Sequence, residues 1–563
     1  MLLLGGLFAQ SSVPPLPPQQ QQPARIAPPP QGYCIAGTVV NSLTGQPIAS
    51  ASVAIAPLAR GAEREISRSA LTGADGRFSF AGLGRGKYSL MATARGFSLQ
   101  YFDHHDPYAT AIATGPESDS EHLVFRLQPD GAIEGVVTDE NGDPVQYATV
   151  RLFHMNTESG QQKVLPENQA QTDDQGRYHI GHVAAGAWYV AVSARPWYAQ
   201  NTRAPEIYDG SLKVVSPSAQ VPQPAVTLDV TYPLTFYPDA TDSASATPLR
   251  LALGERATAN VVLHAVPSLH LRIHTGGAAE SAAIGKMVFP AVSQRLFGGY
   301  LDSISEATTS WVAPGVIEIS GLAPGHYVVE MPASPAGSND KGGRAWFREI
   351  DLAGDTEISA TEGPGFVALD GRILVGNAAH LPKPAFIELS NPDTGESFRG
   401  DLSERGEFDL RSNNIRPGRY QLLLRNAGGF YLTKLSADGA KITGRTVDIG
   451  AAASVHVSAV AAQGTGRVNG AAMRDNESFA GAMIVLVPQD AANNAPLFRR
   501  DQSDSDGTFT LSDVVPGQYT VIAIANGWDL EWANPTVLQP YLKRGETVQV
   551  PPGGELNVKV QVQ

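Results

Sequence analysis

The stretch DGRFSFAGLGRGKYSLMATARGF, from Asp75 to Phe97, decides the fold of this chain. It contains a glycine turn, an alternating segment, a second glycine-bearing loop and a second alternating segment. Alternation puts Phe78 and Phe80 on one face of an extended strand, and Tyr88 and Leu90 on one face of the next. We therefore expect two adjacent antiparallel strands, each with one buried and one solvated side.

The same pattern occurs five times along the chain. The first-turn glycines are Gly76, Gly176, Gly315, Gly406 and Gly507. The second glycines, each followed two residues later by an aromatic residue, are Gly86 with Tyr88, Gly186 with Trp188, Gly325 with Tyr327, Gly418 with Tyr420 and Gly517 with Tyr519. The spacing is that of a whole domain rather than the roughly 20–50 residues of a solenoid repeat.

These anchors predict specific local structure. We expect both glycines of each copy to adopt a positive φ in a tight turn. The aromatic residue is interpreted as a plug of the core whose polar atom binds nearby backbone. Each copy also has further alternating segments, which gives about seven short strands with turn signals every 8–12 residues, a pattern typical of β-sandwiches.

The predicted fold is all-β, with about five immunoglobulin- or transthyretin-like antiparallel β-sandwich domains in series. No stretch shows sustained helical periodicity with caps. The predicted domains are 32–129, 130–266 with a long insertion, 267–363, 364–463 and 464–563. Because contacts rarely cross such linkers, we expect an elongated rod of independent units.

Composition excludes several classes of protein. The chain has 563 residues and a formal net charge of -14, so it lacks the basic character of nucleic-acid-binding proteins. With Cys34 as its one cysteine, it can form no intramolecular disulfide bond. Residues 1–31 combine a short apolar start with a Pro/Gln-rich linker. The apolar start is either a secretory signal that lacks its basic region or a frayed tail. We favour export, to the periplasm, the cell surface or the medium.

The segment IEGVVTDENGDPVQYATVRLF from Ile133, followed by TDDQGRYHI, resembles the carboxypeptidase regulatory-like domain, and so does 35–97. Such domains are similar to collagen-adhesin B-type, starch-binding-like and transthyretin-like sandwiches. The resemblance implies a tandem-repeat protein of exported bacterial type. It does not imply peptidase activity, because function depends on sites that vary within a fold.

Catalytic motifs are absent from the sequence. No histidine begins the His-x-x-Glu pattern of a metallocarboxypeptidase, and neither Gly-x-Ser-x-Gly nor a phosphate-binding loop occurs. We therefore predict a protein that is not an enzyme and has no cofactor.

Two clusters could hold a metal ion, although turn chemistry is the stronger interpretation of both. Asp501, Asp504 and Asp506 stand before Gly507, as in calcium loops, but the downstream Glu is missing. The loop YFDHHDPY from Tyr101 to Tyr108 contains two aspartates and two histidines, which we interpret as solvated. We predict no metal site.

Aromatic residues follow the second anchor strand in equivalent loops. Six of them are candidates for ligand binding: Tyr101, Phe102, Trp197, Tyr198, Trp528 and Trp532. Their faces could stack on sugar rings, whereas the structural alternative is that they close the ends of the sandwiches.

Three functions remain open at this point. The first is a non-catalytic scaffold, spacer or adhesion module at the cell envelope. The second is a carbohydrate-binding protein that uses the loop aromatics. The third is an accessory chain of a peptidase or an outer-membrane transporter. Expected partners are glycans or envelope proteins, without nucleic acid or a transmembrane span; the oligomeric state is open.

Overall fold

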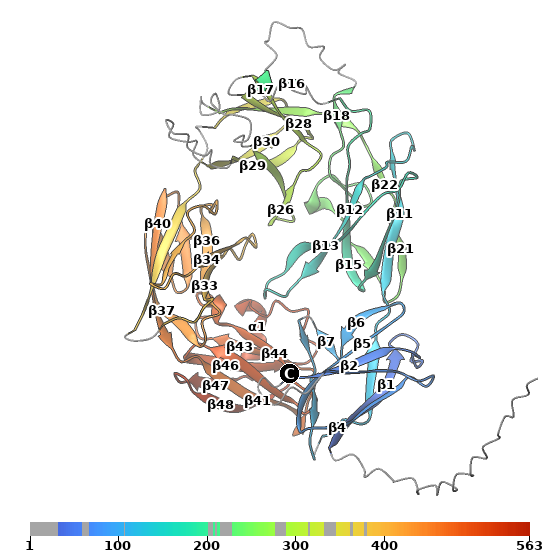
Figure 1. The fold of residues 1–563 in the computed structure, drawn as a ribbon, viewed down its shortest axis with the longest axis vertical. Helices are drawn as coiled ribbons and strands as arrows, with labels where there is room; N and C mark the ends of the chain where they lie inside the picture. The colour runs from blue at the N-terminus through green and yellow to red at the C-terminus, as the bar shows by residue number, and fades with distance from the viewer. Residues whose placement is uncertain are drawn as a thin grey trace, which may run out of the picture.

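The computed structural model describes residues 32–58, 67–105, 107–116, 118–200, 206–208, 211–213, 228–275, 289–313, 316–331, 345–360, 364–376 and 380–563. The predicted N-terminal segment 1–31 and the predicted turn residue Gly315 lie outside these ranges. Within them, strands form five pairs of facing sheets, one pair for each copy of the sequence repeat (Figure 1).

The first unit has one sheet of β1 (Tyr33–Asn41), β4 (Arg77–Leu83) and β10 (Leu123–Leu127), and a second of β2 (Ser52–Pro57), β3 (Arg68–Leu71), β5 (Gly86–Ala94), β6 (Phe97–Tyr101) and β9 (Ile112–Thr114). A small hairpin, β7 (His104–His105) and β8 (Tyr108–Ala109), precedes β9.

The second unit has one sheet of β11 (Gly131–Asp139), β14 (Arg177–Val183), β21 (Arg256–Thr258) and β22 (Val261–Leu263), and a second of β12 (Thr149–Asn156), β13 (Lys163–Gln171), β15 (Gly186–Ser193), β19 (Thr235–Phe236) and β20 (Leu249–Leu251). Its remaining elements are the pair β16 (Glu206–Tyr208) and β17 (Ser211–Lys213), the pair β18 (Val230–Thr231) and β23 (Val266–Pro267), and the 3-10 turn η2 (Ser243–Ser245).

The third unit pairs β24 (Leu269–His274), β27 (Thr308–Ala313), β28 (Val316–Leu322) and β31 (Thr356–Ser359) against β25 (Ala291–Leu296), β26 (Tyr300–Ser303), β29 (Gly325–Met331) and β30 (Trp346–Leu352). The fourth pairs β32 (Ala368–Val375), β35 (Glu407–Asp409), β37 (Phe430–Asp438) and β40 (Ser454–Gln463) against β33 (Phe386–Ser390), β34 (Ser397–Asp401), β36 (Gly418–Arg425), β38 (Ala440–Thr443) and β39 (Thr446–Ile449).

The fifth unit pairs β41 (Gly466–Arg474), β42 (Glu477–Ser478), β45 (Thr508–Val514) and β48 (Glu555–Gln561) against β43 (Met483–Pro488), β44 (Arg499–Gln502), β46 (Gly517–Ile524) and β47 (Glu546–Val550). It also contains the 3-10 turn η3 (Ala495–Leu497) and the helix α1 (Pro535–Leu542). No helix in the described ranges is long and apolar enough to cross a membrane.

The all-β sandwich prediction is confirmed, with one refinement of the strand directions. The first strand of every unit pairs in parallel with a late strand of the same unit, as β1 does with β10 and β41 with β48. The sheets are therefore mixed rather than purely antiparallel, because the closing strand returns beside the opening strand in the same direction.

The two strands of the quoted stretch do not pair with each other. β4 pairs with β1 in one sheet, whereas β5 pairs with β2 in the facing sheet. The segment between them thus crosses from one sheet to the other. The alternation was interpreted correctly, since Phe78, Phe80, Tyr88 and Leu90 are all buried, but alternation alone does not identify a strand's partner.

The repeated aromatic residue plugs this crossing in every unit. Its hydroxyl or indole N–H donates a hydrogen bond to the backbone carbonyl four residues earlier, and the five pairs are Tyr88 to Gly84 (3.2 Å), Trp188 to Ala184 (2.9 Å), Tyr327 to Ala323 (2.6 Å), Tyr420 to Arg416 (2.9 Å) and Tyr519 to Val515 (2.7 Å). All five side chains are buried. The predicted plug and its backbone hydrogen bond are therefore confirmed.

The two glycine anchors differ in conformation. Gly76 has a φ of 72°, and an added Cβ would lie 2.6 Å from the carbonyl oxygen of Val39, so both conformation and space require glycine there. The expectation of a positive φ is wrong for the second glycine of three units, since Gly86, Gly325 and Gly418 are not among the positive-φ glycines, whereas Gly186 (154°) and Gly517 (158°) are. Gly86 begins strand β5, and the chain is already extended where it enters the facing sheet.

Helix α1 was not predicted. Asn534 caps it by accepting a hydrogen bond from the backbone N–H of Thr536 at 3.1 Å, and Pro535 occupies the first turn. Asn followed by Pro is a helix-start signal, but a helix of 8 residues is too short to show clear periodicity.

The five units are arranged as a ring rather than as the predicted rod (Figure 1). Neighbouring units contact each other through polar side chains: Ser98 lies 3.3 Å from His182, Arg151 pairs with Asp302, and Arg416 pairs with Glu330. The blue first unit and the red fifth unit lie side by side in Figure 1, and hydrogen bonds join residues almost 400 positions apart, such as Ala111 and Asp504.

Candidate functional site: the contact between the first and fifth units

Two strands at sheet edges form the contact that closes the ring. β9 lies along the edge of its sheet beside β5, and β44 is the edge strand beside β43. An edge strand exposes unpaired backbone groups, which favours docking against another strand or loop. We call this contact the clasp, made by Lys87 and the described residues of 103–113 against residues 500–508 and Trp528.

Backbone hydrogen bonds give the clasp its register. The N–H of Ser505 donates to the carbonyl of Ala111 at 2.9 Å, and the N–H of Ala113 donates to the hydroxyl of Ser505 at 2.8 Å. The N–H of Ala111 donates to the carboxylate of Asp504 at 2.9 Å. Two small alanines allow this close approach, because larger side chains would separate the two backbones.

Gln502 is the polar centre of the clasp. It is only 2% exposed, and its side-chain amide donates to the carbonyl of Asp103 at 2.6 Å and to the hydroxyl of Thr110 at 2.7 Å. Its carbonyl oxygen lies 3.2 Å from Nδ1 of His105. A buried side-chain amide without hydrogen-bond partners costs free energy, and the partners of Gln502 belong to the first unit. These contacts therefore favour the docked arrangement of the two units.

An ion pair crosses the same contact. Lys87 pairs with Asp504, and its ammonium group also donates to the hydroxyl of Thr508 at 2.7 Å. Both side chains are mostly buried, so removal of either partner would leave a charge without compensation.

An aromatic cluster surrounds one guanidinium group beside this ion pair. Arg500 lies 4.9 Å from the ring centre of Tyr108, 5.5 Å from that of Trp528 and 4.8 Å from that of Trp532. His105 stacks on Trp528, with ring centres 4.6 Å apart and planes inclined by 9°. The cluster thus joins residues of both units through cation–π and stacking contacts.

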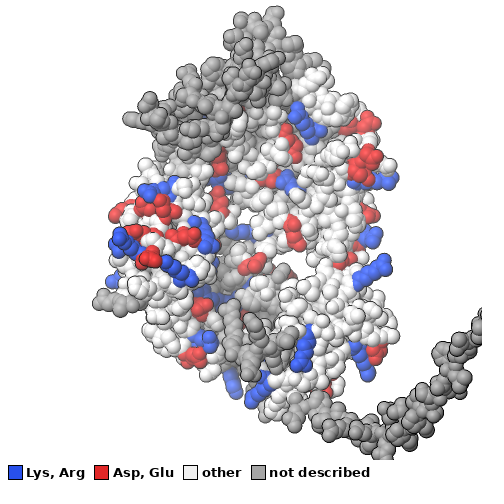
Figure 2. Space-filling model, viewed as in Figure 1, with Lys and Arg blue, Asp and Glu red and all other residues white. Residues whose placement is uncertain are grey.

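Burial dominates the electrostatics of the clasp. It raises the pKa of Asp501 to about 6, against the hydrogen bonds donated to this carboxylate by the backbone of Thr510 and Gln502. Burial also raises the pKa of Asp504, although Lys87 opposes the shift, and lowers the pKa of Arg500. On the face shown in Figure 2, Lys and Arg lie interspersed with Asp and Glu.

The second unit reinforces the clasp from the side. The indole N–H of Trp532 donates to the carbonyl of Thr157 at 3.0 Å, and the backbone N–H of Ala533 donates to the carbonyl of Gly160 at 3.0 Å. The loop after β12 therefore contacts the segment before α1, and three units meet there.

The predicted aromatic ligand site is divided by the structure. Trp528 is partly buried in the clasp, and Trp532 is partly buried beside it against Arg500. Phe102 packs edge-on against Phe125 in the first core, with ring centres 5.5 Å apart. Tyr101 is 37% exposed and lies against His104. Trp197 and Tyr198 lie elsewhere, with ring centres 5.7 Å apart, and Trp197 is 90% exposed.

The three weakly suggested calcium ligands make protein contacts instead. Asp501 and Asp504 take part in the clasp, and Asp506 accepts hydrogen bonds from the backbone and hydroxyl of Thr508 at 3.0 and 2.6 Å. In the described ranges, no group of three or more His, Cys, Asp or Glu side chains is placed to hold a metal ion. Asp106 of the histidine loop lies outside those ranges.

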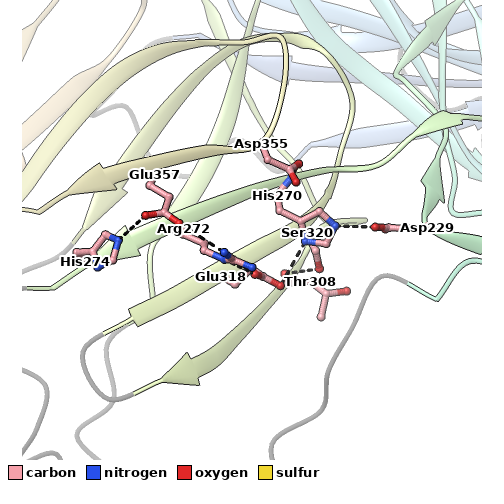
Figure 3. A network of polar contacts seen from close by, with 9 residues as sticks. All are labelled: Asp229, His270, Arg272, His274, Thr308, Glu318, Ser320, Asp355 and Glu357. Carbon is pink, nitrogen blue, oxygen red and sulfur yellow. Dashed lines mark hydrogen bonds and ion pairs between the residues drawn. The ribbon is translucent and has the colours of Figure 1, made fainter. Parts of the chain in front are cut away.

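A second polar network joins the inserted segment of the second unit to the third unit (Figure 3). His270 lies between Asp229, at 2.8 Å, and Glu318, at 3.3 Å, and Glu318 also accepts a hydrogen bond from Arg272 at 2.8 Å. Hydrogen bonding to Glu318 raises the pKa of His270 to about 9, and His270 lowers the pKa of Glu318 to about 2. The charges compensate one another, which suits a structural tie between units.

Sequence reasoning missed Lys87, Arg500 and Gln502. Their partners lie hundreds of residues away, so no local spacing reveals them. One signal was available: two consecutive arginines, Arg499 and Arg500, followed by Asp501 in a strand of a chain with few charged residues. Such a strand must either face solvent or dock against a polar partner.

The family model of the carboxypeptidase regulatory-like domain matches residues 34–116 and 132–216. No curated protein matches the chain. Similar solved structures include a streptococcal ancillary pilin (12% identity, 53% of this chain and 99% of the pilin, TM-score 0.18) and the Bacillus anthracis TIE protein (15% identity, 76% of this chain and 73% of that protein, TM-score 0.14).

A full-length major pilin of Streptococcus pneumoniae is also similar, with 11% identity over 77% of this chain and 99% of the pilin and a TM-score of 0.11. At these identities and TM-scores the likenesses carry no argument about function. The family matches, by contrast, coincide with the first two units and with the motifs quoted above. The chain therefore contains two tandem carboxypeptidase regulatory-like domains, one in its first unit and one in its second.

Proposed function

We propose that this chain is a non-catalytic, exported scaffold of the cell envelope, whose five sandwiches close into a ring. The observation that carries the proposal is the clasp. Lys87, His105 and Asp504 could perform acid–base chemistry, but each is engaged in a contact that holds the first and fifth units together. Asp501 accepts hydrogen bonds from the backbone of its own unit.

The proposal has three further parts. The ranges predicted from the sequence are the domain boundaries, residues 1–31 direct export, and the partner is an envelope protein that binds the outer surface of the ring. The interspersed charges of the face shown in Figure 2 suit a scaffold rather than a polyanion-binding protein.

Cell fractionation and affinity capture test this function. The full chain, expressed with a C-terminal tag in its own host, should accumulate in the periplasm, the envelope or the medium and should retain an envelope protein after mild cross-linking. Purified chain should show no hydrolysis of peptide, ester or glycoside substrates. Accumulation in the cytosol, or measurable turnover of any of these substrates, would contradict the proposal.

Carbohydrate binding is a second candidate function, supported by Trp197 alone. Its indole is 90% exposed and meets Tyr198 edge-on, so its face is open to a sugar ring. Titration with soluble polysaccharides should then give a saturable fluorescence quench that is lost in Trp197→Ala and retained in Trp528→Phe, whose ring lies in the clasp. A flat titration, or a quench that survives Trp197→Ala, removes this candidate.

A further inference from the structure

A cavity of about 340 Å³ lies where the second, third and fourth units meet. Met155, Lys163 and Leu165 line it from β12 and β13, Phe297 and Tyr300 from the β25–β26 hairpin, and Asp393 from the turn before β34. β13 and β26 lie on the inner side of the ring (Figure 1). The volume is within the roughly 300–1,000 Å³ typical of small-molecule sites.

The floor of the cavity is aromatic and fixed. Phe297 packs against Tyr189 and Phe236, with ring centres 4.8 and 5.5 Å apart, and Tyr300 packs edge-on against Phe153 at 5.8 Å. These rings belong to an apolar cluster shared by the second and third units. The apolar body of a ligand would therefore contact a preformed surface. Binding would cost little conformational entropy of the protein, because these side chains are already held in place.

Lys163 supplies an ammonium group that has no ion-pair partner among the described residues. In the part of the chain that the structure describes, no carboxylate lies within ion-pair distance of its ammonium group. Burial lowers the pKa of Lys163, and the charge of Asp393, which acts over a longer distance, opposes this shift. A bound anion would compensate the desolvated ammonium group at short range, whereas Asp393 does so only from a longer distance.

We propose that this cavity binds a small aromatic or aliphatic monocarboxylate, with its carboxylate on Lys163 and its apolar body against Phe297 and Leu165. One negative charge is the right number, because Asp393 at the rim would repel a second. The site requires three units in their closed arrangement, yet it involves neither a clasp residue nor Trp197, so it stands independently of the proposed function.

Calorimetric titration of the full chain with 2-naphthoate tests the proposal. We expect saturable binding of one equivalent, weakened about tenfold or more in Lys163→Met, since a charge-assisted hydrogen bond is lost. Lys163→Arg should retain most of the affinity. The matched control is Lys441→Met, which removes an exposed lysine of the fourth unit and should leave binding unchanged. The neutral methyl ester of 2-naphthoate should bind as weakly as the acid binds to Lys163→Met.

A second measurement needs no variant. Acylation of lysines in the wild-type chain, followed by mass spectrometry, should be slowed by 2-naphthoate at Lys163 and not at Lys441. Absence of saturable binding, equal binding of acid and ester, or unprotected Lys163 at saturating ligand would each overturn the proposal.

Discussion

One aromatic side chain fixes the corner of each sandwich. Tyr519 is buried at the crossing between the two sheets of the fifth unit, and its hydroxyl donates to the carbonyl of Val515 at 2.7 Å. The ring fills volume in the core, while the hydroxyl satisfies a carbonyl that the crossing removes from both sheets. The two contributions can be separated by substitution.

Tyr519→Phe should destabilise the fifth unit by about 1 kcal/mol, because one hydrogen bond is lost. Tyr519→Ala should cost about 3–5 kcal/mol, because a cavity forms in the core. Hydrogen exchange of β43 and β46 amides, followed by mass spectrometry, measures both values for this unit alone. Equal effects of the two substitutions would show that the ring does not fill the core.

Asp501 makes the stability of the fifth unit depend on pH. Burial raises its pKa to about 6, so the folded unit binds a proton more tightly than the unfolded chain does. The contribution of Asp501 to the free energy of unfolding is therefore fully present below the unfolded pKa of about 4. It is lost as the pH rises through 6.

Asp501→Asn should remove this dependence. Relative to the wild type, the variant should gain about 2 kcal/mol between pH 4.5 and pH 7.5, measured by hydrogen exchange of the fifth unit. Asp475→Asn, at an exposed position, is the control and should show no such gain. A difference between Asp501→Asn and the wild type that is the same at both pH values would contradict the assignment.

At the scale of elements, the clasp couples units that the sequence separates. β9 and the β7–β8 hairpin contact residues 500–508 directly. Destabilisation of the fifth unit should therefore spread to these elements. In Tyr519→Ala, hydrogen exchange should accelerate in residues 103–113 and remain unchanged in β33 and β36, which lie in the fourth unit away from the clasp. Unchanged exchange in residues 103–113 would indicate independent units.

Strands were predictable from the sequence, whereas their partners were not. Alternation identified the buried faces of β4 and β5, because a pleated strand exposes every second side chain to one face. It assigned the two strands to one hairpin, because chain neighbours usually pair. In the structure the chain instead crosses between the two facing sheets, so that β4 pairs with β1 in one sheet and β5 with β2 in the other. The aromatic plug was the local signal of that crossing.

The candidate site shows the same limit more strongly. Trp528 and Trp532 were found as unusual loop aromatics, but their partners His105 and Arg500 were not connected to them. Nothing local distinguishes a ring that stacks on a sugar from one that stacks on another unit. Asp504 was found for its turn position, while its ion pair with Lys87 depends on a contact across more than 400 residues.

At the scale of the whole molecule, charge complementarity helps to close the ring. Asp504→Lys places two ammonium groups in a mostly buried contact, which should open the clasp. Small-angle scattering should show a larger radius of gyration than for the wild type. The swapped pair Lys87→Asp with Asp504→Lys should restore much of the compactness.

The control for this experiment is an exposed ion pair within the fourth unit. Glu404→Lys disrupts its 2.8 Å contact with Lys383 and should leave the radius of gyration unchanged. If Asp504→Lys is as compact as the wild type, the Lys87–Asp504 pair does not hold the ring closed.

The distance between the first and fifth units tests the closed ring most directly. Spin labels are placed at Leu99→Cys and Glu477→Cys in a Cys34→Ser background. Leu99 lies four residues before Asp103 and Glu477 four residues before Gly481, and Asp103 and Gly481 are in contact. Since a chain spans at most about 3.5 Å per residue, the labelled backbones must lie within roughly 35 Å of each other. Pulsed dipolar spectroscopy of the full chain should give one narrow distance distribution in this range. A broad distribution beyond about 60 Å, as expected for a rod with its first and last units apart, would contradict the account.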